Sequence, residues 1–371
     1  MDIMKLREYE GLSPFEIKDF LAKAASKVAG TSAVTYLNAG RGNPNWIATE
    51  PREAFFLLGQ FALVESKRVM DLPPGVGGMP KARGIASRMS AWLGRHAEMP
   101  GAGFLGALVP WAVQKFGFDA DKFVHELVDS IIGDNYPVPD RMLVHNEQVV
   151  HEYLQWAMCG SPRPKGKFKL YAVEGGTAAM CYIFKSMKTN RLLNAGDTIA
   201  LGTPIFTPYL EMPHLEDYDL KIVNVQARQE NRWQFDDEEL KKLLDPAVKA
   251  FFLVNPGNPA SVAIDAQTLK RIVSIVKNKR PDLLLLTDDV YGTFVPGFRS
   301  LMGAFPYNTI GVYSYSKYFG CTGWRLGVIA VNEKNLFDDM IARHPEAVKK
   351  KLDKRYGGLT LEPRKIAFID R

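Results

Sequence analysis

Residues 314–325, with the sequence SYSKYFGCTGWR, hold the most reactive combination of side chains in this 371-residue chain. Lys317 follows Ser314 by three positions, and Arg325 lies eight residues further on. A partly desolvated amine beside a cation has a lowered pKa, so it can condense with an aldehyde and later transfer protons. A guanidinium and a hydroxyl suit phosphate oxygens. The segment favours covalent chemistry on a carbonyl compound; an exposed lysine at a strand end is the alternative.

Other polar or glycine-rich groups each follow an apolar run earlier in the chain. They are Gly175, Gly176 and Thr177 after KLYAV, Phe206 and Tyr209 after TIALG, Asn255 and Asn258 after FFLV, and Asp288 and Tyr291 after LLLLT. A turn at Gly176 that opens a helix would point free amide groups at an anion. Taken alone, Gly-Gly-Thr is equally a simple helix start.

The apolar runs themselves predict the scaffold. From residue 167 they read KFKLYAV, TIALGTP, KIVNVQA, AFFLVNP, LLLLTDDV, TIGVYSYS and WRLGVIAV. Short runs rich in Val, Ile and Leu without strict alternation are typical of strands covered on both faces. Leu269, Ile272, Val273 and Val276 recur at the spacing of a helix with one buried face. Alternating strands and helices predict a largely parallel α/β sheet, whose ligands lie at the carboxyl ends of the strands.

The region before this alternation has a different pattern. Residues 13–28 begin with Ser13-Pro14 and predict an N-terminal helix. The segment LNAGRGNPNW at 37–46 is loop chemistry, and residues 82–132 predict a helical insertion.

Composition excludes several classes of protein. The net charge of +6 arises from 47 basic and 41 acidic residues that are interleaved, which argues against a nucleic-acid arm or a membrane-binding stripe. Three widely spaced cysteines form neither a disulfide framework nor a zinc motif, and His145 to His151 lacks the spacing of two zinc ligands on one helix face. No apolar stretch is long enough to span a bilayer, and the start does not resemble a secretory signal. We expect no metal, and a cytoplasmic location.

These motifs, in this order, resemble those of fold-type I pyridoxal-phosphate (PLP) enzymes of the aspartate aminotransferase class, over about residues 135–330. The resemblance implies that Lys317 holds the cofactor as a Schiff base. It implies that Asp288 pairs with the pyridine nitrogen, although Asp289 is an adjacent competitor. A protonated ring nitrogen makes the cofactor an electron sink.

The same resemblance assigns the remaining cofactor contacts. Tyr291 and Asn258 would contact the phenolic oxygen, and Phe206 would stack on the ring, with a core phenylalanine as the alternative. The phosphate would be held by the residues that match the family's phosphate ligands: Gly176, Thr177, Ser314, Arg325 and, from the neighbouring subunit, Tyr136. The last assignment implies a homodimer. The usual Thr-Gly after the asparagine motif is Ala260-Ser261 here.

Over essentially the whole chain, the N-terminal helix, the LNAGRGNPNW loop, the insertion and the EGGTAAM and CTGWRLG sequences resemble the L-aspartate 4-decarboxylase family. This resemblance implies conversion of L-aspartate to L-alanine and CO2, a secondary aminotransferase activity, and large oligomers built from dimers in a bacterial cytoplasm. Gly42 resembles a loop glycine near the substrate carboxylate. Arg41 beside it is a candidate substrate contact or a surface charge.

The resemblance also predicts a domain division. We expect an N-terminal arm and substrate loop at 1–60, a helical insertion at 61–135, a PLP-binding large domain at 136–335, and the start of a small domain at 336–371. Only 54 residues follow Lys317, whereas the family continues into a small domain with an arginine for the substrate α-carboxylate. We therefore expect a C-terminally truncated chain that binds aspartate poorly, since an unpaired buried carboxylate is costly.

Three other functions remain open. The chain could be an ordinary aspartate or aromatic aminotransferase, an inactive truncated protein that serves as an oligomer partner, or a ligand sensor on the same scaffold. The sensor is disfavoured because no helix-turn-helix domain precedes residue 135, and because Lys317 and Asp288 are both present.

Overall fold

A computed structural model describes residues 14–29, 43–134, 136 and 141–371 of the chain. Its centre is an eight-stranded sheet in the order β3-β10-β9-β8-β7-β4-β5-β6. The strands are β3 (Phe168–Val173), β4 (Thr198–Thr203), β5 (Lys221–Arg228), β6 (Gln234–Phe235), β7 (Val248–Val254), β8 (Leu284–Asp288), β9 (Thr309–Ser314) and β10 (Gly327–Asn332). β10 is antiparallel to both its neighbours and β6 is antiparallel to β5, whereas the other pairings are parallel.

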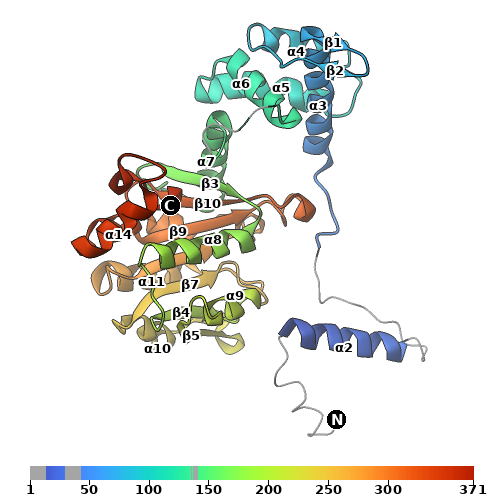
Figure 1. The fold of residues 1–371 in the computed structure, drawn as a ribbon. Coiled ribbons are helices and arrows are strands. Elements are labelled where there is room, and N and C mark those ends of the chain that lie inside the picture. Colours follow the sequence, from blue (N-terminus) through green and yellow to red (C-terminus); the bar gives the residue numbers. More distant parts are fainter. Residues whose placement is uncertain (1–13, 30–42, 135, 137–140) are drawn as a thin grey trace.

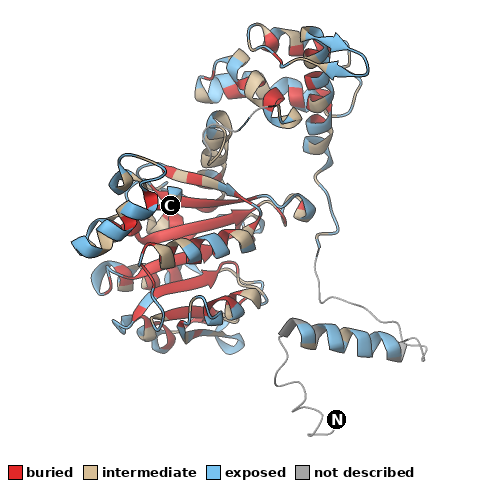
Figure 2. Cartoon of the chain, in the orientation of Figure 1, coloured by how far each residue is buried: buried red, intermediate tan, exposed pale blue. Residues whose placement is uncertain are grey.

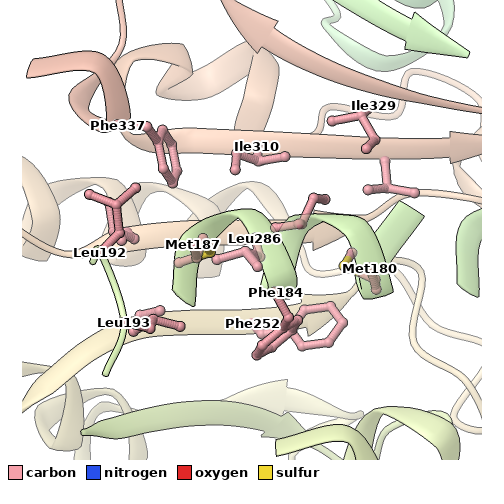
Figure 3. Close-up of a cluster of buried hydrophobic side chains, with 14 of the residues drawn as sticks. Met180, Phe184, Met187, Leu192, Leu193, Phe252, Leu286, Ile310, Ile329 and Phe337 are labelled. Carbon is pink, nitrogen blue, oxygen red and sulfur yellow. The ribbon is translucent and has the colours of Figure 1, made fainter. Parts of the chain in front are cut away.

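One face of the sheet is covered by α8 (Gly176–Thr189) and by the C-terminal helices α13 (Leu336–Ala342) and α14 (Glu346–Tyr356). Figure 3 shows Met180, Phe184 and Met187 of α8 among side chains of the strands. Each such fully buried side chain contributes about 1.5–3 kcal/mol relative to an exposed one. This packing fixes where α8 begins, at the end of β3.

The opposite face packs against α11 (Ala266–Asn278) and α7 (Val144–Met158). α11 starts at Asp265, whose carboxylate accepts a hydrogen bond from the Thr268 amide and so caps the helix. Its Ile272 and Val276 are buried against the sheet. With helices on both faces, β7 to β10 are buried almost throughout, which is why their sequences do not alternate (Figure 2).

A helical lobe precedes this α/β unit in the sequence (Figure 1). It consists of α3 (Thr49–Val69), α4 (Ile85–Gly94), α5 (Ala102–Phe116), α6 (Ala120–Ile132) and the small hairpin of β1 (Asp71–Leu72) and β2 (Val76–Gly77). Phe61, Trp92 and Leu105 belong to a hydrophobic core of its own. Buried Glu65 pairs with Arg68 and Arg88, which offsets the cost of burying a carboxylate.

The remaining elements are short, apart from the N-terminal helix α2 (Pro14–Ala29). The short α-helices are α9 (Pro208–Glu211), α10 (Asp237–Lys241) and α12 (Leu301–Ala304). The single-turn helices are η1 (Met212–His214), η2 (Gln229–Asn231), η3 (Lys242–Leu244), η4 (Gly292–Phe294), η5 (Pro306–Asn308), η6 (Thr322–Trp324), η7 (Pro363–Lys365) and η8 (Phe368–Asp370).

The predicted α/β fold is confirmed, and all seven apolar runs form strands. Covering on both faces is incomplete at β5, where several residues are exposed. α3 continues across the predicted boundary at residue 60. α13 and α14, which follow the predicted boundary at residue 335, pack into the same core as the sheet. The predicted division at 60, 135 and 335 stays a prediction. Among the described helices, none is long and apolar enough to cross a membrane.

Candidate functional site

The carboxyl edge of the parallel strands brings the predicted residues together. Asp288, the last residue of β8, pairs in register with Val312 of β9, and its carbonyl accepts a hydrogen bond of 2.9 Å from the Asn255 amide after β7. β9 ends at Ser314, three residues before Lys317. β10 runs the other way, so its first residue, Gly327, lies at this same edge.

Asp288 is a buried carboxyl group beneath the start of α8. Its Oδ2 accepts a hydrogen bond of 2.7 Å from the Tyr209 hydroxyl, and its Oδ1 accepts one of 3.1 Å from the Val290 amide. A Cβ built on Gly176 would lie 3.4 Å from Oδ2, so the glycine brings the helix start close to the carboxylate. Burial raises the pKa of Asp288, while both hydrogen bonds oppose that shift.

Asp289 faces a different set of groups. Its carboxylate accepts hydrogen bonds from the hydroxyls of Thr287 and Ser300, and Ser300 in turn caps α12. Burial raises the pKa of Asp289 to about 7. The structure therefore separates the two adjacent carboxyl groups: Asp288 lies beside Tyr209 and α8, and Asp289 is held by hydroxyls near α12.

Lys317 is half-buried in the loop between β9 and β10. The pKa of its amine is lowered, first by burial and then by the positive charge of Arg325. Both effects favour the neutral, nucleophilic form of an amine. The loop closes on itself through hydrogen bonds from the Gly320 amide to the Lys317 carbonyl at 3.2 Å and from the Cys321 amide to the Ser316 carbonyl at 3.1 Å.

Arg325 lies against the turn before α8. Its backbone has φ of +54°, and one guanidinium nitrogen donates to the Thr322 carbonyl at 2.9 Å. A Cβ on Gly175, where φ is +95°, would lie only 2.7 Å from another guanidinium nitrogen, so this position requires glycine. α8 begins at Gly176 with its first amides directed outward, next to a cation. A helix start and a guanidinium at one place form an anion-binding cradle.

Three further predicted residues lie near this edge. The buried Ser314 hydroxyl is 3.1 Å from the Leu326 carbonyl and 2.9 Å from Ser316 Oγ. The Asn258 amide donates to the Tyr291 hydroxyl at 3.4 Å. The pKa of Tyr291 is raised by burial and then by the negative charge of Asp288.

The aromatic residues after β4 form a small group. Phe206 is partly buried and makes an edge-to-face contact with Tyr209, with ring centroids 5.3 Å apart. Tyr209 itself is buried against Phe252 of β7. The partner of Asp288 is thus Tyr209, which had been recognised only as one of the residues at a strand end.

The remaining predicted site residues are Tyr136, Arg41 and Gly42. Tyr136 is 94% exposed. Arg41 and Gly42 lie outside the described residues. In the described part of the chain, no group of three or more His, Cys, Asp or Glu side chains could hold a metal ion. The sequence places Gly175 at a strand end but gives it no role; the structure shows that it makes room for the Arg325 guanidinium.

The arrangement at this edge combines an amine of lowered pKa, an anion cradle and a buried carboxylate. Similarity to known proteins shows the family of this chain. Residues 173–359 match the family model "Aminotransferase class I and II". The chain belongs to the class I and II aminotransferase family. The match begins at the end of β3 and continues past α14, so it includes every strand end described above.

Aminotransferase relatives cover the chain to different extents. A "Bifunctional aspartate aminotransferase and L-aspartate beta-decarboxylase" from Pseudomonas sp is 51% identical over 98% of this chain and 68% of its own length. An aspartate aminotransferase from Pyrococcus abyssi is 31% identical over 39% of this chain and 37% of its own. Among solved structures, an alanine aminotransferase from Pyrococcus furiosus is 23% identical with a TM-score of 0.48, covering 60% of this chain and 55% of that one.

Proposed function

We propose that this protein is a PLP-dependent enzyme that converts L-aspartate to L-alanine and CO2, with a secondary aspartate aminotransferase activity. The observation that supports this most directly is the 51% identity to the bifunctional relative over 98% of the chain. Aspartate is its substrate under this proposal, because both activities in that relative's name act on aspartate.

The described side chains fit PLP. The cofactor is an aldehyde with a phosphate and a ring nitrogen, and when bound it supplies an electron sink for bonds at the substrate's α-carbon. Lys317 would hold its aldehyde carbon, since the amine's pKa is lowered. The phosphate would be held by Arg325, by Ser314 and by the amides at Gly176 and Thr177 at the start of α8. Gly175 leaves the space that the Arg325 guanidinium occupies there.

The remaining contacts follow from the same placement. Asp288 would face the ring nitrogen and keep it protonated, helped by the hydrogen bond from Tyr209. The Tyr291 hydroxyl, next to the Asn258 amide, would meet the phenolic oxygen, and Phe206 would cover the ring.

The chemistry assigned to the chain's own groups centres on Lys317. After substrate replaces it, its free amine would remove the proton from Cα of aspartate and return a proton later. Burial and the positive charge of Arg325 lower the pKa of that amine, which favours its neutral, basic form. Asp288, which is buried, would hold a negative charge beside the ring nitrogen of a bound cofactor and so would stabilise the positive charge there.

The proposal includes assembly and location. We propose a homodimer in which Tyr136, fully exposed in one chain, reaches the partner's phosphate site, with dimers forming larger oligomers in the cytoplasm. Size-exclusion chromatography with light scattering, with and without PLP, measures the mass. A monomer under both conditions contradicts this part of the proposal and leaves the assignment of Lys317 intact.

Cofactor attachment tests the central assignment. The chain is incubated with PLP, its visible absorption spectrum is recorded, and borohydride is added before peptide mass spectrometry. We expect irreversible labelling at Lys317, and loss of both the absorption band and the label in Lys317→Ala. Lys334→Ala, which removes an exposed lysine just after β10, serves as the matched control and should behave as the wild type. Labelling at a different lysine, or an unchanged spectrum in Lys317→Ala, contradicts the proposal.

A second measurement separates the related functions. Aspartate alone is added to the PLP-loaded chain, and CO2, alanine and oxaloacetate are quantified. CO2 with equimolar alanine supports the decarboxylase, whereas oxaloacetate without CO2 supports an ordinary aminotransferase. If PLP is attached but neither product forms, the chain is an inactive member of the family.

A further inference from the structure

The loop that follows Lys317 is bound by a segment from far away in the sequence. The carbonyls of Tyr318, Phe319 and Gly320 all accept hydrogen bonds from residues 46–52. The Trp46 indole donates to Tyr318 at 3.0 Å, and the Ala48 amide donates to Phe319 at 3.4 Å. Three successive carbonyls held by one distant segment indicate a specific docking of this loop (Figure 1).

Arg52, in the first turn of α3, provides the strongest of these contacts. One terminal nitrogen donates to the carbonyls of Ala48 at 2.7 Å and Phe319 at 3.2 Å, and the other donates to Gly320 at 2.8 Å. Its guanidinium also lies 5.1 Å from the ring centre of Trp324. A planar fork with fixed donors can bridge two carbonyls in this way, whereas the donors of a lysine ammonium are not fixed in this geometry.

The contact is close enough to dictate a residue type. Gly320 has φ of +60°, and a Cβ on it would lie 2.1 Å from the Trp46 carbonyl. The glycine therefore allows the two backbones to meet. On the other side of the loop, Trp46 packs edge to face on Phe294, which in turn packs on Tyr318.

We propose that Arg52, assisted by Trp46, is a positioning residue that holds the Lys317 loop in the conformation needed for cofactor attachment. Within the loop itself, the closing hydrogen bonds come from the amides of Gly320 and Cys321. Without the contacts from residues 46–52, the carbonyls of residues 318–320 would bond to water, and the loop could adopt other conformations. This inference rests on the proposed role of Lys317 and adds that the helical lobe, through α3, controls the cofactor site.

The test compares Arg52→Ala, Arg52→Lys and the control Lys67→Ala, which removes an exposed cation further along the same helix. Hydrogen–deuterium exchange of the Gly320 and Cys321 amides is measured without cofactor, and the Kd for PLP is measured by titration. Arg52→Ala removes the hydrogen bonds of a charged group to the loop. We therefore expect roughly tenfold faster exchange of the Gly320 and Cys321 amides and a roughly tenfold higher Kd for PLP. Arg52→Lys should recover part of both effects, and Lys67→Ala should match the wild type.

Trp46→Phe provides a milder variant if Arg52→Ala fails to fold. It replaces the indole by a smaller aromatic ring and removes the N–H that reaches the Tyr318 carbonyl, so both readouts should shift in the same direction by a smaller factor. Unchanged exchange at Gly320 and Cys321 in Arg52→Ala or Trp46→Phe overturns the inference. Because exchange is measured without PLP, this result is independent of whether Lys317 binds the cofactor, which Lys317→Ala tests separately.

Discussion

Asp288 and Asp289 are neighbours in the chain but should respond very differently to the same change. Asp288→Asn removes the charge proposed to face the ring nitrogen, and we expect activity to fall roughly a hundredfold or more with little change in stability. Asp289→Asn alters a carboxyl group bonded to Thr287 and Ser300, and we expect a loss of about 1–3 kcal/mol in unfolding free energy. Aspartate turnover and urea denaturation measure the two effects. The reverse pattern would show that Asp289 serves the cofactor.

Asp289 also predicts a pH dependence of stability. The folded chain holds this proton up to a pH of about 7, because burial raises the pKa of Asp289 to about 7, whereas the ordinary value is 3.8. Between these values the folded state binds more protons than the unfolded state, so this group's contribution to unfolding free energy falls as pH rises from about 4 to 7. The unfolding free energy, obtained from denaturation curves at several pH values across that range, should fall less steeply with pH in Asp289→Asn than in the wild type. Parallel pH profiles would contradict the assignment.

Tyr209→Phe tests the partner of Asp288 without changing the shape of the core. The hydroxyl donates to Asp288 at 2.7 Å, and this hydrogen bond lowers the pKa of that carboxyl against the effect of burial. Without it, the pKa of Asp288 should rise, and the Kd for PLP should increase about tenfold. Titration with PLP at two pH values measures this. Tyr291→Phe is the comparison, since its hydroxyl lies beside Asn258.

For single residues, the sequence supplies residue types and spacing but does not show in which direction each side chain points. The spacing of Ser314, Lys317 and Arg325 was enough to predict their meeting at one edge. It could not choose between Asp288 and Asp289, because adjacent residues at a strand end face opposite sides and the sequence does not say which side holds the site. Tyr209 was missed as a partner because nothing local in the sequence joins it to a strand 79 residues away.

The turn into α8 gives a prediction about an element. Gly175→Ala places a methyl group where the Arg325 guanidinium lies and also strains a backbone with φ of +95°. Gly196→Ala is the matched control, because its φ is +83° and nothing lies within 4 Å of the added Cβ. Both should lose about 1–2 kcal/mol in stability, but only Gly175→Ala should weaken PLP binding, by about tenfold or more. Equal Kd values in the two variants would remove Arg325 from the cradle.

The elements most accessible to sequence reasoning were the buried strands and α11. Their composition follows from burial on both faces, which the sequence records directly. The two-residue strands β1, β2 and β6 were not predicted, because so short a segment has no periodicity to detect. The antiparallel direction of β10 was equally hidden, since a reversed strand buried on both faces has the same composition as its neighbours.

The helical lobe has a hydrophobic core separate from those on the two faces of the sheet, which predicts separate losses of stability. Phe61 of α3 is 1% exposed within the lobe, so Phe61→Ala should destabilise α3 to α6 by about 3–5 kcal/mol. Phe56→Ala on the same helix, at 59% exposure, should cost less than about 0.5 kcal/mol. Hydrogen exchange should accelerate in the lobe and remain slow in the central strands. Uniform acceleration would mean that the two parts unfold together.

For the whole molecule, sequence reasoning recognised a helical region before an α/β unit but could not say how they meet. The docking of Arg52 and Trp46 onto residues 318–320 joins positions more than 260 residues apart in sequence. Polar contacts to backbone carbonyls leave no residue-type signal on the accepting side, so the sequence shows only the donors. The close approach of the two backbones leaves a separate trace, the glycine at position 320.

The reversed direction of β10 has a consequence for how the protein could be rearranged. Lys317 and Arg325 occupy a single hairpin connection from β9 to β10, between Ser314 and Gly327. Lys317 and Arg325 therefore stay on one short segment, whatever order the other strands have along the polypeptide. New termini opened elsewhere, for example in the loop at Gly196, would leave this pair intact, whereas a cut between residues 317 and 325 would divide it.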